Sequence, residues 1–295
     1  MNLTGWGIAL GYFDGVHLGH RKLVETLCRQ SKKMGLRTMV YTFENHPQNV
    51  VNPKNSVPLI YSPEEKYRIL CELGVDRVEM APFDVGVSQM SPEGFFEEVL
   101  VKKHNIKYGV VGFNFRFGKG GKGDVVLLKS LGEKAGAKID VVEPVMLKGQ
   151  LISSSYIRQL LAEGDIKKAN YCLGSRYFVS GRVEKGKGRG NGMGIPTANI
   201  RMPEGVLYPA RGVYATSTLI EGKRYRSITN VGINPTFNGN RMGIETHVCG
   251  LERDLYDRFI RVEFIDKMRE EKQFKNREEL RRQIELDIKN LENYF

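Results

Sequence analysis

The chain has 295 residues, of which 41% are hydrophobic and 27% charged, and its formal net charge at pH 7 is +11. This length favours two domains, and the composition excludes a chain that is largely disordered. The positive charge suits an anionic partner such as a phosphorylated small molecule, a nucleic acid or an anionic lipid, and charge alone does not choose among them.

Up to about residue 160, short apolar runs alternate with amphipathic segments, which is typical of a parallel sheet wound by helices. We expect strands at 7–11, 38–43, 77–81, 108–112 and 138–142. Leu23, Val24 and Leu27 fall at helical spacing after the first strand, and Asp124 stands where it can cap a later helix. The predicted fold class of this half is α/β, with a doubly wound parallel sheet.

From Tyr177 onward, short alternating segments are separated by glycine and proline, which indicates antiparallel β-structure. Expected strands at 213–219, 225–231, 244–249 and 258–264 predict a small β-barrel. A closing helix is predicted because Asn276 and Glu279 have capping-box spacing and precede a single apolar stripe. We therefore predict a domain at 1–160, a connecting helix or linker at 161–175, and a second domain at 176–295.

His17, Gly19 and His20 lie where the first expected strand gives way to the first helix. A helix that follows a parallel strand directs its free amide hydrogens and partial positive charge at an anion bound there. Gly19 allows the backbone to approach a phosphate closely, and the two imidazoles can donate hydrogen bonds to it. Phosphate transfer needs mainly such positioning and charge stabilisation, and the competing interpretation is that the pair is merely two satisfied polar residues.

A serine run at 153–155 begins another short helix, with Arg158 one turn later. Serines at a helix start and a nearby arginine make a second anion site. An ordinary N-cap explains one of these serines and leaves the others available for binding.

Four segments follow one another at strand ends: Gly11-Tyr-Phe-Asp-Gly-Val-His-Leu-Gly-His20, Thr42-Phe-Glu-Asn-His-Pro47, Val111-Gly-Phe-Asn-Phe-Arg-Phe-Gly118 and Ile152-Ser-Ser-Ser-Tyr-Ile-Arg158. In this order they closely resemble the FMN adenylyltransferase half, of the HxGH nucleotidyltransferase type, in bacterial bifunctional riboflavin kinase/FAD synthetases. The resemblance implies catalytic roles for His17 and His20. It assigns ATP and phosphate binding to Gly11, Phe13, Asp14, Gly19, Asn114, Ser154, Ser155 and Arg158, although Asn114 stands where many relatives have aspartate.

The run from Lys185 to Asn199 combines five glycines with three cations and ends in Pro-Thr-Ala-Asn. It reads as a phosphate-cradling loop, with a flexible solvated linker as the rival interpretation. Thr197 and Asn199 offer oxygen ligands of the kind that Mg²⁺ accepts. The candidate ATP-binding residues are Gly186, Lys187, Gly188, Arg189, Gly194 and Pro196.

The stretch from about 174 to 291 is similar to the riboflavin kinase module of the same family, through Gly194-Ile-Pro-Thr-Ala-Asn199, Arg211-Gly-Val-Tyr214, Asn230-Val-Gly-Ile-Asn-Pro-Thr236 and Glu245-Thr-His-Val248. The resemblance assigns Thr197 and Asn199 to Mg-ATP and makes Glu245 the general base. The competing interpretation of Glu245 is an exposed residue on an edge strand. Asp257 replaces the glycine of relatives, and we expect it to tolerate a left-handed turn.

The leading hypothesis is therefore a bifunctional enzyme that uses ATP and Mg²⁺ to convert riboflavin to FMN and FMN to FAD. Alternatives are a monofunctional FAD synthetase with a decayed kinase domain, another HxGH nucleotidyltransferase, and a flavin-sensing or RNA-binding regulator. A nucleic-acid partner is disfavoured because no basic stripe follows a helix. Self-association stays open.

No expected apolar run is long enough to cross a membrane and no secretory signal is apparent, so we expect a cytoplasmic protein. The scattered cysteines Cys28, Cys71, Cys172 and Cys249 read as reduced core residues, with no zinc-like spacing. We expect His104 to be a surface residue, whereas a structural and a functional role both stay open for His46.

Overall fold

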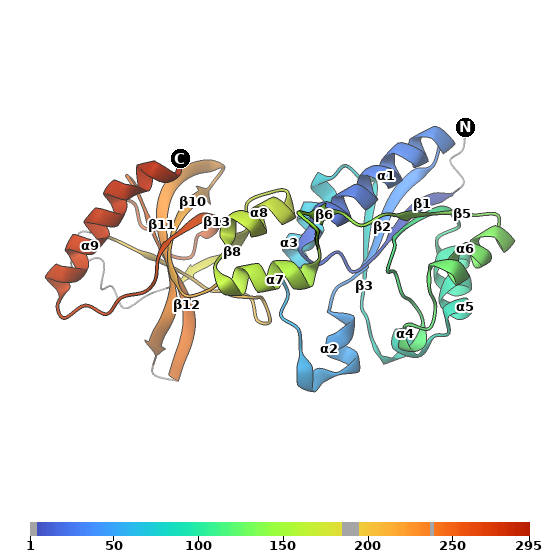
Figure 1. Ribbon diagram of the computed structural model, residues 1–295, viewed down its shortest axis with the longest axis horizontal. Helices are drawn as coiled ribbons and strands as arrows, with labels where there is room; N and C mark the ends of the chain where they lie inside the picture. The colour runs from blue at the N-terminus through green and yellow to red at the C-terminus, as the bar shows by residue number, and fades with distance from the viewer. Residues whose placement is uncertain (1–4, 185–194, 237–238) are drawn as a thin grey trace. The chain divides into compact units, whose positions relative to one another are not determined.

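A computed structural model describes residues 5–184, 195–236 and 239–295. The chain divides into two compact units, Met1–Ser154 and Ser155–Phe295 (Figure 1). Within the described residues, no helix is both long enough and apolar enough to cross a membrane.

The first unit is built on a parallel sheet in the order β3-β2-β1-β4-β5. Its strands are β1 (Trp6–Leu10), β2 (Arg37–Phe43), β3 (Arg77–Ala81), β4 (Ile106–Gly112) and β5 (Lys138–Val142). The five expected strands are confirmed, with small changes at their ends. Strands are added on one side of β1 up to β3, and β4 and β5 are added on its other side. Open α/β sheets bind ligands where the strand order reverses in this way, beyond the carboxyl ends of the strands.

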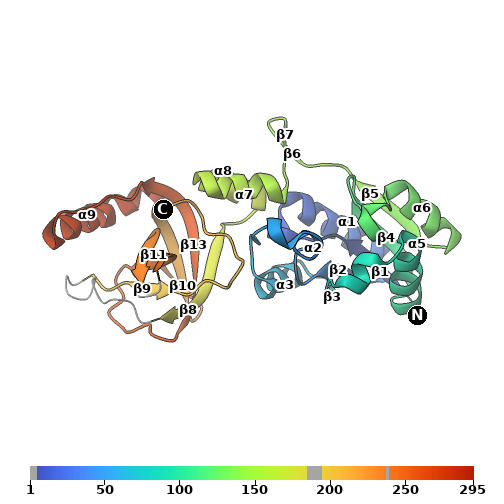
Figure 2. The same cartoon turned by 90° about the horizontal axis from the view of Figure 1, so that it is seen from below.

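Helices cover both faces of this sheet, as Figures 1 and 2 show. Helix α1 (Leu18–Met34) buries Leu23, Val24 and Leu27. It packs so closely on β1 that a Cβ on Gly7 would lie 3.2 Å from Leu27 Cδ1. On the other face, the π-helical segment η3 (Phe95–Lys103) and α6 (Val125–Lys134) contribute to a core that includes residues of β1, β2 and β4. The predicted doubly wound α/β fold is confirmed.

Shorter elements complete the first unit. They are η1 (Asp14–Val16), α2 (Pro47–Val51), η2 (Pro53–Asn55), α3 (Pro63–Glu72), α4 (Val85–Gln89), α5 (Pro92–Gly94), η4 (Lys119–Gly121), β6 (Met146–Leu147) and β7 (Gln150–Leu151). The expected cap of α6 is confirmed, because Asp124 accepts hydrogen bonds from the amides of Val126 and Leu127. The β6–β7 hairpin stands out from the rest of its unit (Figure 2).

Two expectations about individual side chains were wrong. His104 is only 4% exposed and meets the ring of Tyr41 edge-on at 5.7 Å. His104 stands in the short turn between η3 and β4, where Asn105 has φ 47°. This position brings its side chain against Tyr41 of the sheet. Burial lowers the pKa of His104. Cys71 is exposed on α3 and is not a core residue.

The second unit begins with α7 (Ser154–Glu163) and α8 (Ile166–Leu173). A closed antiparallel barrel follows, in the order β10-β11-β12-β9-β8-β13. Its strands are β8 (Phe178–Glu184), β9 (Ala198–Ile200), β10 (Gly212–Ile220), β11 (Lys223–Thr236), β12 (Gly239–Val248) and β13 (Phe259–Arg269). The predicted barrel is confirmed. Asp257 adopts the expected left-handed backbone, at φ 60°.

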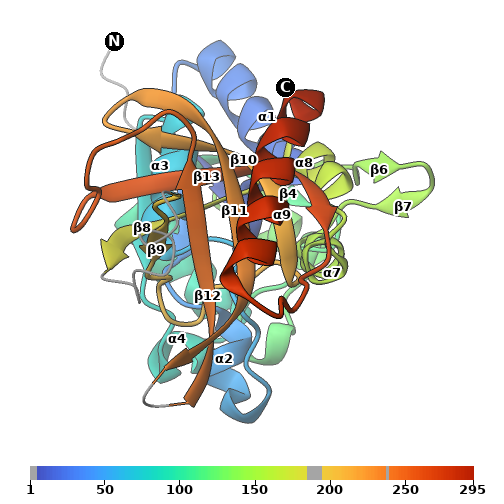
Figure 3. The same cartoon turned by 90° about the vertical axis from the view of Figure 1, so that its left-hand side faces the viewer.

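The predicted C-terminal helix is also confirmed, as α9 (Arg277–Asn290), with a short turn η6 (Leu291–Tyr294) after it. Asn276 accepts a hydrogen bond from the amide of Glu279 at 2.9 Å. Ile288 and Leu291 belong to an apolar cluster with Val213, Ala215 and Ile228, and so fasten the helix to the barrel wall (Figure 3).

Candidate functional site

The segment that joins β1 to α1 has an unusual backbone. Phe13 lies at φ 56° and Val16 at φ 41°, with Gly15 at φ 79° between them. A β-branched residue such as Val16 is strained in this left-handed region. The segment therefore keeps its shape only because surrounding groups hold it.

Three separate parts of the first unit provide these tethers. The Asp14 carboxylate accepts a hydrogen bond from the Ile60 amide at 3.1 Å, and the Ser154 hydroxyl donates to the Asp14 carbonyl at 2.9 Å. The Thr42 hydroxyl donates to the Tyr12 carbonyl at 2.8 Å. The motifs at residues 11–20 and 42–47 thus meet at the carboxyl edge of the sheet, together with Ser154 of the motif that begins at Ile152.

His17 and His20 lie at the N-terminal end of α1, with their rings stacked and the ring centroids 3.7 Å apart. Burial lowers the pKa of His17 to about 4. The pKa of His20 lies well below its ordinary value, mainly through burial and further through the nearby charges of His17 and Lys66. Among the described residues, neither Nδ1 atom has a hydrogen-bond partner. The pair is therefore neutral near pH 7, and a bound phosphate at the start of this helix can receive an N–H hydrogen bond from each ring.

Gly19 leaves room for this arrangement. A Cβ at this position would lie 3.0 Å from Cε1 and 3.1 Å from Nδ1 of His17. Such contacts are tighter than ordinary van der Waals packing, so any side chain at residue 19 would press on the histidine ring.

The other residues predicted for this site differ in exposure. Phe13 and Asp14 are buried, so they form the floor of the segment before His17. Gly11 follows β1 directly, and the exposed Asn114 follows β4, the strand beside β1. Ser155 is exposed and Arg158 is half-buried on α7. His46 caps α2 by accepting a hydrogen bond from the Gln48 amide.

Four polar side chains lie in a row across neighbouring strands of the barrel wall in the second unit. Glu245 on β12 lies directly opposite Asn199 on β9, and Asn199 lies opposite Glu184 on β8. On its other side, Glu245 lies opposite Asn230 on β11. Directly opposite residues in antiparallel strands share one face, with Cβ atoms about 4.5 to 5.5 Å apart. The register therefore brings two carboxylates and two amides together.

This row lies on the outer face of the barrel wall. Ile244 and Thr246 on either side of Glu245 are buried, as are Ala198 and Ile200 on either side of Asn199. The sequence expectation that Glu245 and His247 lie on the face opposite Ile244 is confirmed. His247 Nδ1 lies 2.9 Å from the Pro196 carbonyl oxygen, which fastens the start of the Pro-Thr-Ala-Asn segment to β12.

Thr197 and Asn199 present a hydroxyl and an amide oxygen two residues apart, beside the carboxylate of Glu245. These are hard oxygen donors, and they fit Mg²⁺, which is usually held by few protein ligands together with substrate phosphates. Within residues 5–184, 195–236 and 239–295, no cluster of three or more His, Cys, Asp or Glu is suited to a metal ion. Gly186, Lys187, Gly188, Arg189 and Gly194 lie outside the described residues.

Sequence reasoning missed three charged residues near these sites. Glu184 joins the polar row only through strand register. Glu271 accepts a hydrogen bond from Arg211 Nε at 2.7 Å and lies 3.5 Å from Asn230 Nδ2, so it links two of the predicted kinase motifs. Lys66 lies buried beside the HxGH segment. Nothing in the local sequence distinguishes these residues from surface charges.

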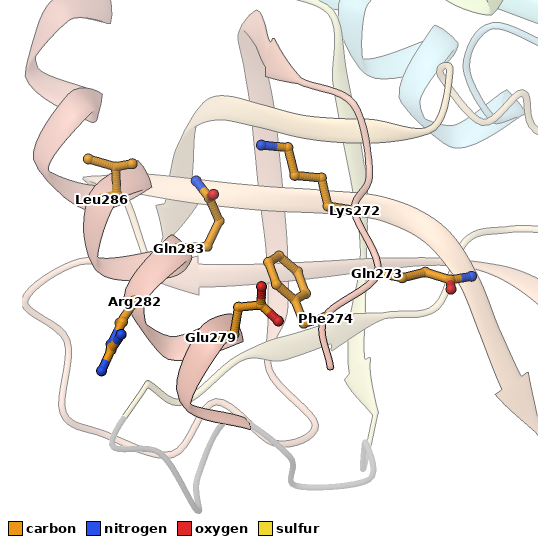
Figure 4. Close-up of a pocket in the computed structure, with 7 residues that line it drawn as sticks. All are labelled: Lys272, Gln273, Phe274, Glu279, Arg282, Gln283 and Leu286. Carbon is orange, nitrogen blue, oxygen red and sulfur yellow. The ribbon is translucent and has the colours of Figure 1, made fainter. Parts of the chain in front are cut away.

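The described part of the second unit also contains an open pocket of about 320 Å³, between α9 and the segment that leads into it (Figure 4). Phe274 and Leu286 supply apolar lining, and Lys272 and Arg282 supply positive charge. None of the predicted site residues lines this pocket.

A doubly wound sheet with a histidine pair at its switch point, followed by a barrel with a carboxylate–amide row, defines a two-domain nucleotide-dependent transferase. A family model described as FAD synthetase matches residues 2–156, and one described as riboflavin kinase matches residues 173–295. The chain belongs to the family of bifunctional riboflavin kinase/FMN adenylyltransferases.

Individual relatives cover nearly the whole chain. The bifunctional riboflavin kinase/FMN adenylyltransferase of Bacillus subtilis (strain 168) is 36% identical over 293 residues, which cover 98% of this chain and 92% of the relative. The protein of the same name from Escherichia coli (strain K12) is 35% identical over 292 residues, with 99% and 93% covered. A crystal structure described as a macrolide-efflux protein from Streptococcus pneumoniae matches with a TM-score of 0.91 and 29% identity, covering 100% of this chain and 96% of that one. Both activities inferred from the sequence motifs, riboflavin phosphorylation and FMN adenylylation, are thus confirmed at the level of the family.

Proposed function

We propose that the two activities are divided between the two candidate sites. FMN adenylylation takes place at the His17–His20 segment of a domain comprising residues 1–160. Riboflavin phosphorylation takes place at the Glu245 row of a domain comprising residues 176–295, and residues 161–175 connect the two. The substrates are ATP, riboflavin and FMN, in the cytoplasm, without a nucleic-acid partner.

In the adenylylation reaction, a phosphate oxygen of FMN attacks the α-phosphorus of ATP. The bond between that phosphorus and the oxygen bridging to the β-phosphate breaks, and pyrophosphate leaves. Neutral His17 and His20 donate N–H hydrogen bonds to the phosphate oxygens on which charge develops, and the N-terminus of α1 adds its partial positive charge. Ser154, Ser155 and Arg158 bind the remaining phosphate oxygens. The observation that supports this assignment is the stacked histidine pair at a helix N-terminus, whose Nδ1 atoms have no hydrogen-bond partner among the described residues.

In the kinase reaction, the terminal ribityl hydroxyl of riboflavin attacks the γ-phosphorus of ATP, and ADP leaves. Glu245 accepts the proton of that hydroxyl as a general base. Thr197 and Asn199 would hold Mg²⁺, which when bound neutralises negative charge on the phosphate oxygens. The cross-strand position of Asn199 opposite Glu245 supports this assignment, because a metal ion held by Asn199 would lie close to a general base at Glu245.

Steady-state assays of the separate half-reactions test the division. With supplied FMN, His20→Ala should lower kcat for FAD formation by about 100-fold or more, since preorganised donors typically contribute that much. With riboflavin, Glu245→Gln should lower kcat for FMN formation by a similar factor. Each variant should keep the other activity within about twofold. If either variant loses both activities, or neither, the assignment of two separate sites is wrong.

A further inference from the structure

Lys66 is a lysine on α3 that is 2% exposed. Its ammonium group donates hydrogen bonds to the Phe43 carbonyl at 2.5 Å and to the Tyr12 carbonyl at 3.3 Å. It also lies 4.2 Å from the centre of the Tyr12 ring, within range of a cation–π interaction. A buried ammonium is costly unless such partners replace its water. Burial lowers the pKa of Lys66 to about 8, while the charges of Asp14 and Glu44 act to raise it.

The two carbonyl groups belong to places where the chain leaves the sheet. Phe43 is the last residue of β2, and Tyr12 is the second residue after β1. One ammonium group thus joins the ends of two neighbouring parallel strands. Phe13 follows Tyr12 directly in the chain, and the strained Val16 stands three residues further on, just before His17. The orientation of the Tyr12 peptide therefore sets the path of the backbone toward the histidine pair.

The start of α3 is built as a rigid support for this contact. Ser62 caps the helix by accepting a hydrogen bond from the Glu65 amide at 3.3 Å, and Ser62, Glu65 and Lys66 are all buried. The Ile60 amide, just ahead of the cap, donates to the Asp14 carboxylate. Residues 60–66 thus form hydrogen bonds with the strained segment at two residues, Asp14 and Tyr12.

We propose that Lys66 is a positioning residue for FMN adenylylation. Its hydrogen bonds to the Tyr12 and Phe43 carbonyls fix the backbone that leads to His17 and His20. This inference rests on the proposed role of the histidine pair. Lys66 acts through the backbone and does not itself touch the reacting phosphates. Its loss should therefore reduce kcat, because misplacing catalytic groups by about 1 Å can cost a factor of about 100.

The test uses the full-length chain with Lys66→Met, which keeps a long side chain and removes the charge and the donors. We expect kcat for FAD formation from FMN to fall by about tenfold to a hundredfold, with KM for FMN nearly unchanged. Riboflavin phosphorylation by the same protein should stay within about twofold and serves as an internal control. The matched control is Lys102→Met, because Lys102 is an exposed lysine of the same unit, paired only at the surface with Glu98. This variant should behave as the unchanged protein.

A double-mutant cycle separates positioning from general destabilisation. Thr42→Val removes the other hydrogen bond to the Tyr12 carbonyl while keeping the shape of the side chain. If both residues act through that carbonyl, Thr42→Val should also lower kcat, and the double variant should lose less than the product of the two single factors. Independent structural damage would give multiplicative losses. Trp6, the single tryptophan of the chain, lies on β1 and reports by fluorescence whether the first unit is folded.

The proposal is overturned if folded Lys66→Met makes FAD with a kcat within about twofold of the unchanged protein. If Lys66→Met does not fold, Thr42→Val decides alone, and unchanged kcat in that variant overturns the proposal. His17→Ala distinguishes this failure from failure of the proposed site. If His17→Ala keeps FAD synthesis, the histidine site is wrong, whereas loss in His17→Ala together with unchanged Lys66→Met refutes only the role of Lys66.

Discussion

The imidazole rings of His17 and His20 lie nearly parallel, with their centroids 3.7 Å apart and their planes inclined by 19°. Two charged imidazoles at this separation would repel each other, and burial disfavours even one charge. The arrangement is therefore stable only when the rings are neutral, and this gives both the stability and the activity of the first unit a dependence on pH.

The stability of the first unit should decrease in acid. Because the folded protein lowers the pKa of His17 from 6.5 to about 4, the unfolded chain binds the proton more readily between these values. The stabilisation is complete above about pH 6.5 and is lost as the pH falls toward 4, with a limit on the order of 3 kcal/mol for this residue. His17→Gln should weaken this dependence. Urea unfolding at pH 7.5 and pH 5, followed by Trp6 fluorescence, measures it.

The control for this measurement is His247→Gln, because His247 lies in the barrel and not in the unit that Trp6 reports. It should leave the Trp6 transition unchanged at both pH values. An equally steep loss of stability in His17→Gln and in the unchanged protein would contradict the burial of a neutral His17.

Gly19→Ala should slow FAD formation without lowering the stability of α1. The new Cβ would lie 3.0 Å from the His17 ring and displace it by a few tenths of an ångström, so FAD formation should slow by about tenfold. Alanine is at the same time the better helix former, by less than the roughly 0.5 to 1 kcal/mol of a helix interior, because Gly19 is the second residue of α1. Kinetics of FAD formation and Trp6-monitored unfolding check the two effects. Full activity would show that the histidine ring has room to move.

Asn199→Ala should change the metal requirement of one reaction only. Since Asn199 is a proposed Mg²⁺ ligand, its removal should raise the Mg²⁺ concentration for half-maximal riboflavin phosphorylation by about tenfold or more. A Mg²⁺ titration of both half-reactions measures the change, and the curve for FAD formation from FMN should not move. An unchanged curve for FMN formation would remove Asn199 from the metal site.

The C-terminal helix should depend on one buried ion pair. Arg269 Nη2 lies 2.7 Å from Asp287 Oδ2, and the side chains are 16% and 5% exposed. Asp287→Ala leaves the arginine without its partner, so the second unit should lose about 3 kcal/mol or more. Calorimetry should show one unfolding transition shifted to lower temperature while the Trp6 transition stays in place. Glu285→Ala on the same helix removes only the exposed pair with Arg281 and should change stability by less than about 0.5 kcal/mol.

The fold was largely predictable because apolar runs bounded by turn residues mark strands independently of their partners. The expected strands at 38–43 and 138–142 are nearly those observed, since each contains a short run rich in apolar and β-branched residues, Met39 to Phe43 in β2 and Ile139 to Val142 in β5. Two-residue strands such as β6 and β7 carry no comparable pattern, and the sequence analysis did not predict them. The helical caps at Asp124 and Asn276 were predictable because each depends only on residues two or three positions away.

The sites were predictable in part. The HxGH segment could be selected as a candidate because it joins a strand to a helix, and open α/β sheets bind ligands beyond the carboxyl ends of their strands. The pairing of Glu184 with Asn199 could not be predicted, because it depends on strand register and barrel closure. Lys66 follows Pro63, Glu64 and Glu65, a sequence that reads as an exposed first helical turn, and only the packing of α3 against the HxGH segment buries it.

The most direct test of two separate sites is complementation between two variants in one tube. During an incubation that lets the unchanged protein convert its riboflavin once with ATP and Mg²⁺, His17→Ala should accumulate FMN with little FAD, and Glu245→Gln should leave nearly all the riboflavin unconverted, because each lost activity is lower by about 100-fold. When the two proteins are mixed and the flavins are separated by chromatography, the account predicts FAD, because FMN released by one protein is adenylylated by the other. FAD from the mixture no faster than from the separate variants, or FAD from His17→Ala alone at the rate of the unchanged protein, would contradict it.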